Sequence, residues 1–209
     1  MIQPPLVDVN LISVHDKKEY QYDATLSTYM VKSDDEYQVS VSLTRPPKDK
    51  TTVYSVDCTI DGENAGVSFL VKPECNHTFV FKGSPLDSTG VKRKNFKFGG
   101  ANLVGSSFSS TTNVGVITVR VFEATDTGEE FRKQNNIQAS NFTKKDVQES
   151  GRKFFEDQKL QTFLGSTFNG DAINYDLTYR ASKLLCKVIC KYDDESHVSM
   201  RKKARTSCL

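Results

Sequence analysis

The strongest constraint on the fold is a block from Val53 to Ala124, in which short runs of alternating polar and apolar residues follow one another between turn signals. A period of two places successive side chains on opposite faces of a strand. Asp61-Gly62 marks the first tight turn, because glycine accepts a positive φ without strain. This pattern favours an antiparallel β-sandwich over alternating strands and helices. The runs are Val53–Ile60, Val67–Val71, Thr78–Phe81, Asn95–Gly100 and Gly115–Ala124.

The residues before this block continue the same pattern. Leu6 to Val14, Tyr20 to Thr28 and Tyr37 to Leu43 each alternate, and we predict that they are half-buried strands. Pro46-Pro47 would end the third of them, since proline cannot donate to a strand ladder. We therefore predict a flexible lead over residues 1–5 and a β-sandwich domain over residues 6–124.

The character of the sequence changes after Ala124, and we predict that residues 125–209 form an appendage. Thr143 and Asp146 have the spacing of a capping box, and the apolar residues that follow predict a helix over about residues 144–164. Residues 177–192 fit a helix or a strand, and their valine, isoleucine and cysteine content favours a strand. The basic run Arg201–Arg205 is expected to be a solvated tail.

The composition gives no strong indication of a charged partner. The 209 residues carry a formal net charge of +2, a balance that does not require nucleic acid or an anionic membrane. No run of about 18 apolar residues is present, so we predict no membrane span. The N-terminal residues lack a basic segment followed by an apolar one. We therefore expect the protein inside the cell, or in a virus particle, and not secreted.

The residues that enzymes use are sparse. The imidazoles His15, His77 and His197 lie in polar stretches or at strand edges, and no nucleophile motif accompanies them. Asp57 and Asp61 are candidates for the paired carboxylates of a glycosidase by location alone. We therefore predict that the chain is not an enzyme and has no catalytic or cofactor-binding residues.

Metal sites need clustered ligands, and the sequence shows none. Cys186 and Cys190 lack the further ligands of a zinc site and are expected to be buried structural residues. The acidic triplets Asp34–Glu36 and Asp193–Glu195 lack the alternation and the central glycine of a calcium loop. We interpret both triplets as solvated turns.

Two groups of basic residues are the candidate contact sites, one on a predicted strand and one in the tail. Basic residues interleaved with aromatic ones, as around Phe96 and Phe98, are typical of sheets that bind nucleic acid. The same pattern suits an edge strand whose lysines discourage unwanted pairing. The second interpretation is favoured, so nucleic acid is not the expected main partner. The candidate residues are Lys92, Arg93, Lys94, Lys97, Arg201, Lys202, Lys203 and Arg205.

Several of these elements follow one another in a recognisable order. Ile60-Asp61-Gly62 precedes the small-residue turn Ala65-Gly66, Lys92–Lys94 leads into Asn95–Gly99, and a Ser/Thr-rich stretch leads into Gly115–Val121. This order resembles an uncharacterised all-β domain family known chiefly from fungal and other eukaryotic proteins. Its members share an Asp-Gly turn, a Phe-x-Phe strand and a Gly-x-Ile-x-Val strand. The resemblance implies a jelly-roll-like sandwich with a helical or extended appendage, and no activity to transfer.

A stable scaffold without converging titratable groups predicts a structural or interaction module of a larger assembly. Such an assembly would hold other proteins or further copies of the chain, and a minor structural component of a large virus particle is one form that suits the architecture. A carbohydrate-binding sandwich is the second hypothesis, with surface tyrosines stacking on a sugar. Association with nucleic acid through the two basic groups is the third. The tyrosines concerned are Tyr20, Tyr22, Tyr37 and Tyr54.

Overall fold

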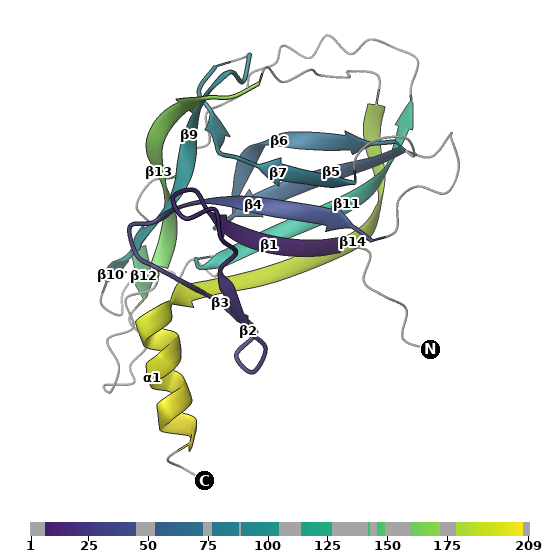
Figure 1. Ribbon diagram of the computed structural model, residues 1–209. Helices are drawn as coiled ribbons and strands as arrows, with labels where there is room; N and C mark the ends of the chain where they lie inside the picture. Colours follow the sequence, from purple (N-terminus) through teal and green to yellow (C-terminus); the bar gives the residue numbers. More distant parts are fainter. Residues whose placement is uncertain are drawn as a thin grey trace, which may run out of the picture.

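The chain is mainly β in a computed structural model (Figure 1), which confirms the predicted class at that level. One helix occurs among the residues that the structure describes. These residues are 7–44, 53–72, 77–87, 89–104, 114–126, 142, 146–148, 160–171 and 179–206. The predicted lead over residues 1–5 lies outside them.

The first sheet has six strands, and every pairing in it is antiparallel. Four strands lie in a row, and two short ones pair with β4 and β9. The row is β1 (Val7–Ser13), β4 (Glu36–Leu43), β9 (Lys92–Gly100) and β13 (Leu160–Asn169); β7 (Thr78–Phe81) pairs with β4, and β8 (Ser84–Pro85) pairs with β9.

The second sheet also has six strands, and it is mixed. β14 pairs with β3 in parallel, whereas the other pairings in this sheet are antiparallel. A separate parallel pair joins β10 (Asn102–Val104) to β12 (Asp146–Gln148). The pairings are therefore mainly antiparallel, as predicted, with two parallel ones that the sequence did not predict. The order in the second sheet is β2 (Gln21–Asp23), β3 (Thr28–Val31), β14 (Tyr179–Asp194), β11 (Val116–Asp126), β5 (Val53–Ile60) and β6 (Glu63–Val71).

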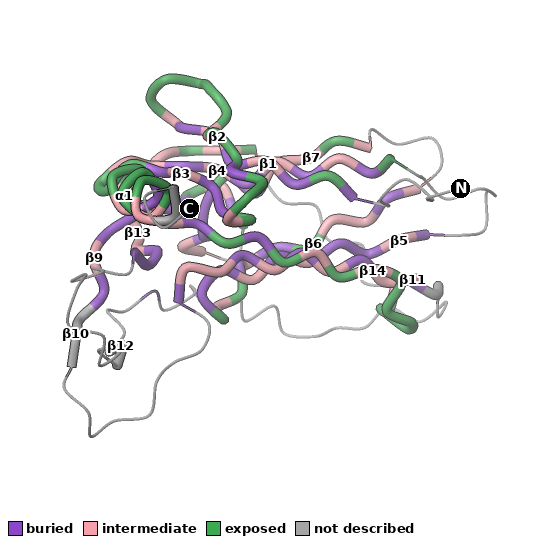
Figure 2. The backbone as a smooth tube through the Cα atoms, turned by 90° about the horizontal axis from the view of Figure 1, so that it is seen from below, coloured by how far each residue is buried: buried purple, intermediate pink, exposed green. Residues whose placement is uncertain are grey.

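The main core lies between the two sheets, which form two layers in Figure 2. Tyr37, Phe96 and Phe98 of the first sheet are fully buried, as are Val56 and Ile117 of the second. The Tyr37 and Phe98 rings stack with centroids 3.9 Å apart. Both layers thus bury one face against the other, which is why their strands alternate.

The alternation in the N-terminal part predicts two strands correctly and one incorrectly. In β1 and β4 every second side chain is buried, as predicted. The stretch from residue 20 to 28 is instead broken by a turn, because Asp23 Oδ1 accepts hydrogen bonds from the Thr25 and Leu26 backbone N–H groups at 2.9 and 3.0 Å. A side chain that mimics a backbone turn in this way ends β2 and starts β3.

The predicted helix over residues 144–164 is wrong wherever the structure describes that range. Residues 146–148 form β12 and residues 160–164 begin β13, while residues 149–159 lie outside the described part. β13 pairs with β9 from Leu160 opposite Gly100 onward. A sheet partner distant in the sequence thus overrides the local helical pattern.

The predicted boundary at residue 124 is also wrong, because β13 and β14 are members of the two sheets. β14 confirms the strand preferred for residues 177–192 and lies between β3 and β11. The expected solvated tail is instead the helix α1 (Glu195–Thr206). In Figure 1 this helix extends from the end of β14 at the lower left.

Candidate functional site

The basic residues predicted on β9 do not form one surface. Successive side chains alternate, so Lys92 and Lys94 lie on one face of the strand and Arg93 and Lys97 on the other. Lys92 is exposed, whereas Lys94 and Lys97 are partly buried. Lys97 Nζ also lies 3.1 Å from Asp34 Oδ1. This group therefore offers no continuous contact site.

Arg93 is a structural residue and not a contact residue. It is buried, and its Nε donates a hydrogen bond to the Gly90 carbonyl oxygen at 2.5 Å. Its Nη2 donates to the Asp171 carbonyl oxygen at 2.9 Å. A guanidinium can satisfy several backbone carbonyls at once because it holds five N–H donors in one plane. Arg93 thus joins the turn before β9 to the segment after β13.

The basic residues of the predicted tail help to hold α1 against the protein. Arg201 Nη2 lies 2.9 Å from Asp193 Oδ2. Lys202 forms an ion pair with Asp23. Val198, one helical turn before these two residues, is fully buried. Lys203 is exposed, and Arg205 belongs to the last described turn of the helix.

Both aspartates in these ion pairs are shielded from solvent. The Asp193 side chain is 14% exposed, so its triplet is not the solvated turn that we expected. His197 Nδ1 lies 3.5 Å from Asp193 Oδ1, one helical turn along. The hydrogen bond from Lys202 holds the pKa of Asp23 below its usual value. These contacts attach the helix to the side of the second sheet where β2 and β14 lie.

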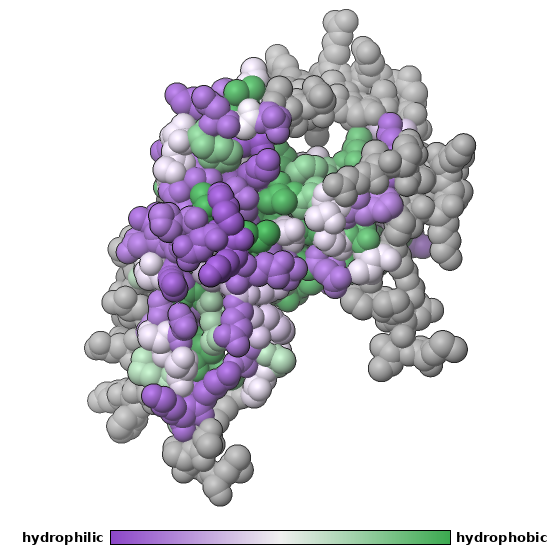
Figure 3. Space-filling view, in the orientation of Figure 1, coloured by the Kyte–Doolittle hydropathy of each residue, from purple (hydrophilic) through white to green (hydrophobic). Residues whose placement is uncertain are grey.

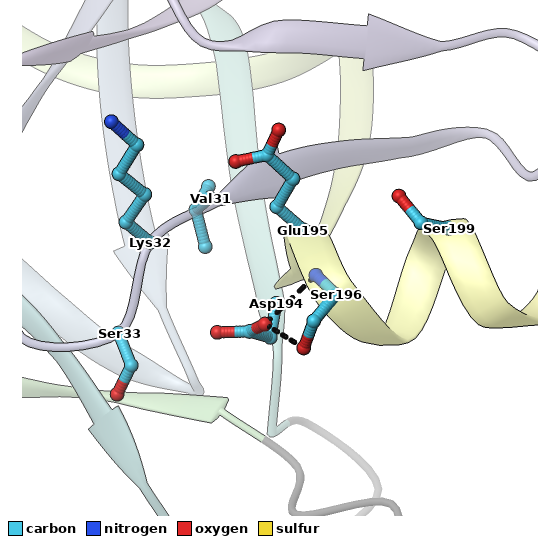
Figure 4. A pocket seen from close by; sticks show the side chains of 7 residues that line it. All are labelled: Val31, Lys32, Ser33, Asp194, Glu195, Ser196 and Ser199. Carbon is cyan, nitrogen blue, oxygen red and sulfur yellow. Dashed lines mark hydrogen bonds between the residues drawn. The ribbon is translucent and has the colours of Figure 1, made fainter.

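An open pocket of about 310 Å³ lies where α1 begins (Figure 4). The Asp194 and Ser196 side chains turn toward each other there, and Asp194 Oδ1 accepts a hydrogen bond from the Ser196 backbone N–H at 2.9 Å. Burial raises the pKa of Asp194, but the hydrogen bonds from Ser196 outweigh it and the net shift is downward. This carboxylate therefore serves as the helix cap. The remaining lining residues are Val31, Lys32, Ser33, Glu195 and Ser199.

A buried polar network crosses the core at Asp61, which is 1% exposed. Asp61 Oδ1 accepts from the backbone N–H groups of Gly115 and Val116 at 2.8 and 3.1 Å. Asp61 Oδ2 accepts from the Thr162 N–H at 2.6 Å and from the Tyr192 hydroxyl at 2.7 Å. One carboxylate thus joins the β5–β6 turn to β11, β13 and β14.

The Asp61 network is occupied by its own internal partners. The Thr162 hydroxyl lies 2.9 Å from the Tyr192 hydroxyl and 2.7 Å from that of Tyr37. Burial raises the pKa of Asp61, although its four donors act in the opposite direction. A fully bonded carboxylate in the core stabilises a unique arrangement of strands and offers little to a substrate.

Asp57 cannot act with Asp61 as a glycosidase pair. Asp57 lies on the outer face of β5, where its Oδ1 accepts from the Ser68 hydroxyl at 2.9 Å. Its Oδ2 lies 3.5 Å from Arg120 Nη2. Asp61 is enclosed in the core, so the two carboxylates face different environments. The sequence indicated neither the burial of Asp61 nor its partners, because all four lie at least 54 residues further along the chain.

The tyrosines considered for sugar binding do not share a platform. Tyr37 is fully buried, and Tyr54 packs against the core. Tyr20 is half-buried and hydrogen-bonds to Asp35 through its hydroxyl. Tyr22 is exposed, and its ring is tilted against that of Tyr29 with centroids 5.0 Å apart.

The most unusual described surface lies on β14. Leu184, Leu185 and Ile189 are 48%, 37% and 55% exposed, and Lys187 between them is exposed as well. We call these four residues the β14 surface. In Figure 2 exposed residues are prominent at this end of the lower layer. The sequence shows these apolar residues as a stripe. It does not show which of them face the core, as Cys190 does, and which face outward.

The charges beside the β14 surface are unbalanced. Lys187 lies directly opposite Arg120 on the neighbouring strand β11. Arg120 has Asp57 on its other side. Among the residues that the structure describes, no acidic side chain forms an ion pair with Lys187. Like charges directly opposite each other weaken a sheet, so this pair would gain from an added anion.

Other surfaces of the described part are less distinctive. Hydrophilic side chains cover much of the face seen in Figure 3, with some hydrophobic ones near its middle. No group of three or more histidine, cysteine, aspartate or glutamate side chains in the described ranges could hold a metal ion. None of the described helical residues forms a helix long and apolar enough to cross a membrane.

The fold and these sites together define a mainly β protein with two facing sheets, an apolar core crossed by a hydrogen-bonded polar network, and a described strand with exposed apolar and basic residues. Comparison with protein-family models, with curated proteins and with solved structures finds no match for this chain. Function must therefore be argued from the residues of the chain itself.

Proposed function

We propose that this chain is a non-enzymatic structural and interaction module of a larger protein assembly, built on a jelly-roll-like β-sandwich. The observation that carries the proposal is the β14 surface, where large apolar side chains are exposed beside lysine on a strand that continues into the core. Apolar residues gathered on an otherwise polar surface mark contact sites more often than single exposed ones do. The assembly lies inside the cell or forms a virus particle.

The distribution of ionisable groups also supports this proposal. The buried carboxylate Asp61 has four internal donors, and Asp194 caps a helix. Arg93, Arg201 and Lys202 hold segments of the chain together. Groups that are committed to the fold are poor candidates for acid–base chemistry, which needs a titratable side chain within reach of a substrate.

The alternative hypotheses have less support. Sugar binding needs aromatic rings on an accessible face, and Tyr37 and Tyr54 contribute to the core instead. Nucleic-acid binding through the two predicted groups would need cations on one surface, whereas those of β9 lie on two faces and Arg93 is buried. A blank glycan array, and binding to nucleic acid that does not weaken with salt, would remove these alternatives.

The test is sedimentation of the tagged full chain after mild lysis of the cells that produce it. We expect the chain in fractions much heavier than its own 23.4 kDa. Ile189→Asp should move it to the light fractions, because a buried carboxylate in the contact is costly. Lys92→Glu, on an exposed residue of β9, is the matched control and should stay in the heavy fractions. A wild-type chain that sediments alone would contradict the proposal.

A further inference from the structure

One edge of the second sheet is partly uncovered. β14 pairs with β11 from Tyr179 to Lys191, so one side of the strand is occupied along this length. On its other side β3 pairs only with residues 191–194. Within the described ranges no strand covers that second side from residue 183 to 190. An uncovered edge presents backbone N–H and C=O groups to a further strand.

The same segment carries the exposed apolar residues. Leu184 pairs with Phe122 across β11, and Ile189 pairs with Thr118. Leu185 falls at the irregularity between these pairs. Apolar side chains at an open edge would add burial to the backbone hydrogen bonds that an extended segment makes there.

The charge at this edge selects the partner. Lys187 lies within the length that no described strand covers and faces Arg120, whereas Lys183 at the end of that length faces Glu123. Lysines at a strand edge oppose pairing with a second copy of the same strand, because they would bring further cations to the edge. A strand with carboxylates at alternate positions would instead relieve the repulsion between Lys187 and Arg120.

We propose that the uncovered edge of β14 binds an extended segment of another protein in which acidic and apolar residues alternate, and that this segment adds a strand to the second sheet beyond β14. The apolar side chains pack on Leu184, Leu185 and Ile189, and a carboxylate lies near Lys187. This inference rests on the proposed function and names the chemistry of the partner.

Three labelled peptides of equal length test the inference with the full chain by fluorescence anisotropy. In the first peptide glutamate alternates with valine, in the second lysine replaces glutamate, and the third is the first with alternate backbone nitrogens methylated. We expect the first to bind and the second to bind at least about tenfold more weakly, since an attractive charge contact of 1.4 kcal/mol corresponds to that factor. The methylated peptide should lose binding because it cannot complete a strand ladder.

Variants of the chain place the contact on β14. Lys187→Glu should weaken binding of the glutamate peptide about tenfold or more, and Ile189→Asp should weaken it too, while Lys92→Glu should leave it unchanged. Lys187→Glu should also raise the melting temperature slightly, because glutamate opposite Arg120 replaces repulsion by attraction. A loss of binding with a stability gain cannot come from misfolding.

The remaining outcomes all decide the question. If the methylated peptide binds as tightly as the unmethylated one, charge attraction is sufficient for binding and strand addition is overturned. Equal binding of the lysine peptide, or a concentration-dependent dimer that Ile189→Asp abolishes, would overturn the acidic partner. If no peptide binds while Ile189→Asp still releases the chain from heavy fractions, this inference fails and the proposed function stands. If the peptide binds but the chain sediments alone, the proposed function fails.

Discussion

The two flanks of the second sheet differ in how they are covered. At the β6 flank, Phe69 packs on Phe79 and Phe81 of the first sheet with ring centroids 4.9 Å apart in both pairs. Gly66 of β6 also lies so close to Pro85 that a Cβ there would stand 2.4 Å from the proline Cδ. At the β14 flank, ion pairs hold α1, and no strand of the described part covers the strand edge before residue 191.

The flank that stabilises the fold most is therefore not the flank that exposes apolar residues. Aromatic burial at the β6 flank joins the two layers and contributes a stabilisation that salt and pH hardly change. At the β14 flank the cations Arg201 and Lys202 remain 39% and 49% exposed and the apolar groups are solvated, so both contribute less to the unfolding free energy than aromatic burial does. One flank thus keeps the layers together, while the other includes a length of strand edge that no described strand covers.

The largest expected effect comes from the closed flank. Phe81 is fully buried in the aromatic group, so Phe81→Ala should lower the unfolding free energy by about 4 kcal/mol through lost burial and a cavity. Ile189→Ala on the open flank should change it by less than about 0.5 kcal/mol. Urea unfolding followed by fluorescence measures both. Similar losses for the two variants would abolish the contrast.

Asp61 connects the two flanks, because it lies in the β5–β6 turn and accepts a hydrogen bond from Tyr192 of β14. Asp61→Ala leaves three backbone N–H groups and the Tyr192 hydroxyl without their acceptor, at a cost of about 3 kcal/mol. Asp61→Asn should cost less, because its amide oxygen still accepts from Gly115 and Val116. Thermal unfolding of the two variants gives the order. An alanine variant as stable as the wild type would mean that the network is dispensable.

The raised pKa of Asp61 adds a pH signature to this comparison. A carboxyl whose pKa is higher in the folded state stabilises the fold most below its unfolded value, and this contribution is lost as pH rises through the folded value. The difference in stability between the wild type and Asp61→Asn should therefore be larger in mild acid than at neutral pH. A difference that shrinks on acidification would contradict the assignment.

Gly66 tests how tightly the β6 flank is closed. Its φ is +89°, and an alanine Cβ would meet Pro85, so Gly66→Ala should cost about 2 kcal/mol from strain and contact together. The double variant with Pro85→Ala should recover the contact part but not the backbone part. Melting temperatures of the single and double variants measure the recovery. Full recovery would show that the positive φ costs nothing.

The smallest effect concerns α1 at the open flank. The pKa values of Asp23 and Asp194 are lowered in the folded state, so their contribution is present above the unfolded values near 4 and is lost as pH falls through the folded values. In acid, NMR signals of α1 should shift while those of β7, which holds no carboxylate, stay. High salt should act in the same direction. Simultaneous changes in helix and sheets would contradict this separation.

The sequence predicted the strands that carry a clear alternation and missed those defined by distant partners. β1, β4 and β5 have alternating patterns with one buried face, so the pattern alone locates them. β13 lacks such a pattern, since its exposed and buried residues form two blocks rather than alternating. Its pairing with β9 joins residues at least 60 positions apart, and no local sequence pattern reports such a pairing.

The candidate site was harder to predict for a related reason. Leu184, Leu185 and Ile189 are typical core residues by type. Their exposure follows from the placement of β14, one side of which has no partner strand before residue 191 within the described part. The prediction failed in the opposite way for the basic residues. Arginine usually lies on the surface, but Arg93 makes the contacts of a core residue.

The position of β14 has a consequence for synthesis. The strand is made after all the others, yet it stands between β3 and β11 and separates them. While the ribosome is still translating residues 179–194, those two neighbours have a vacant place between them and cannot reach their final pairing. The second layer therefore closes only after residues 179–194 have been made, and until then the apolar face that β14 helps to bury is open to aggregation.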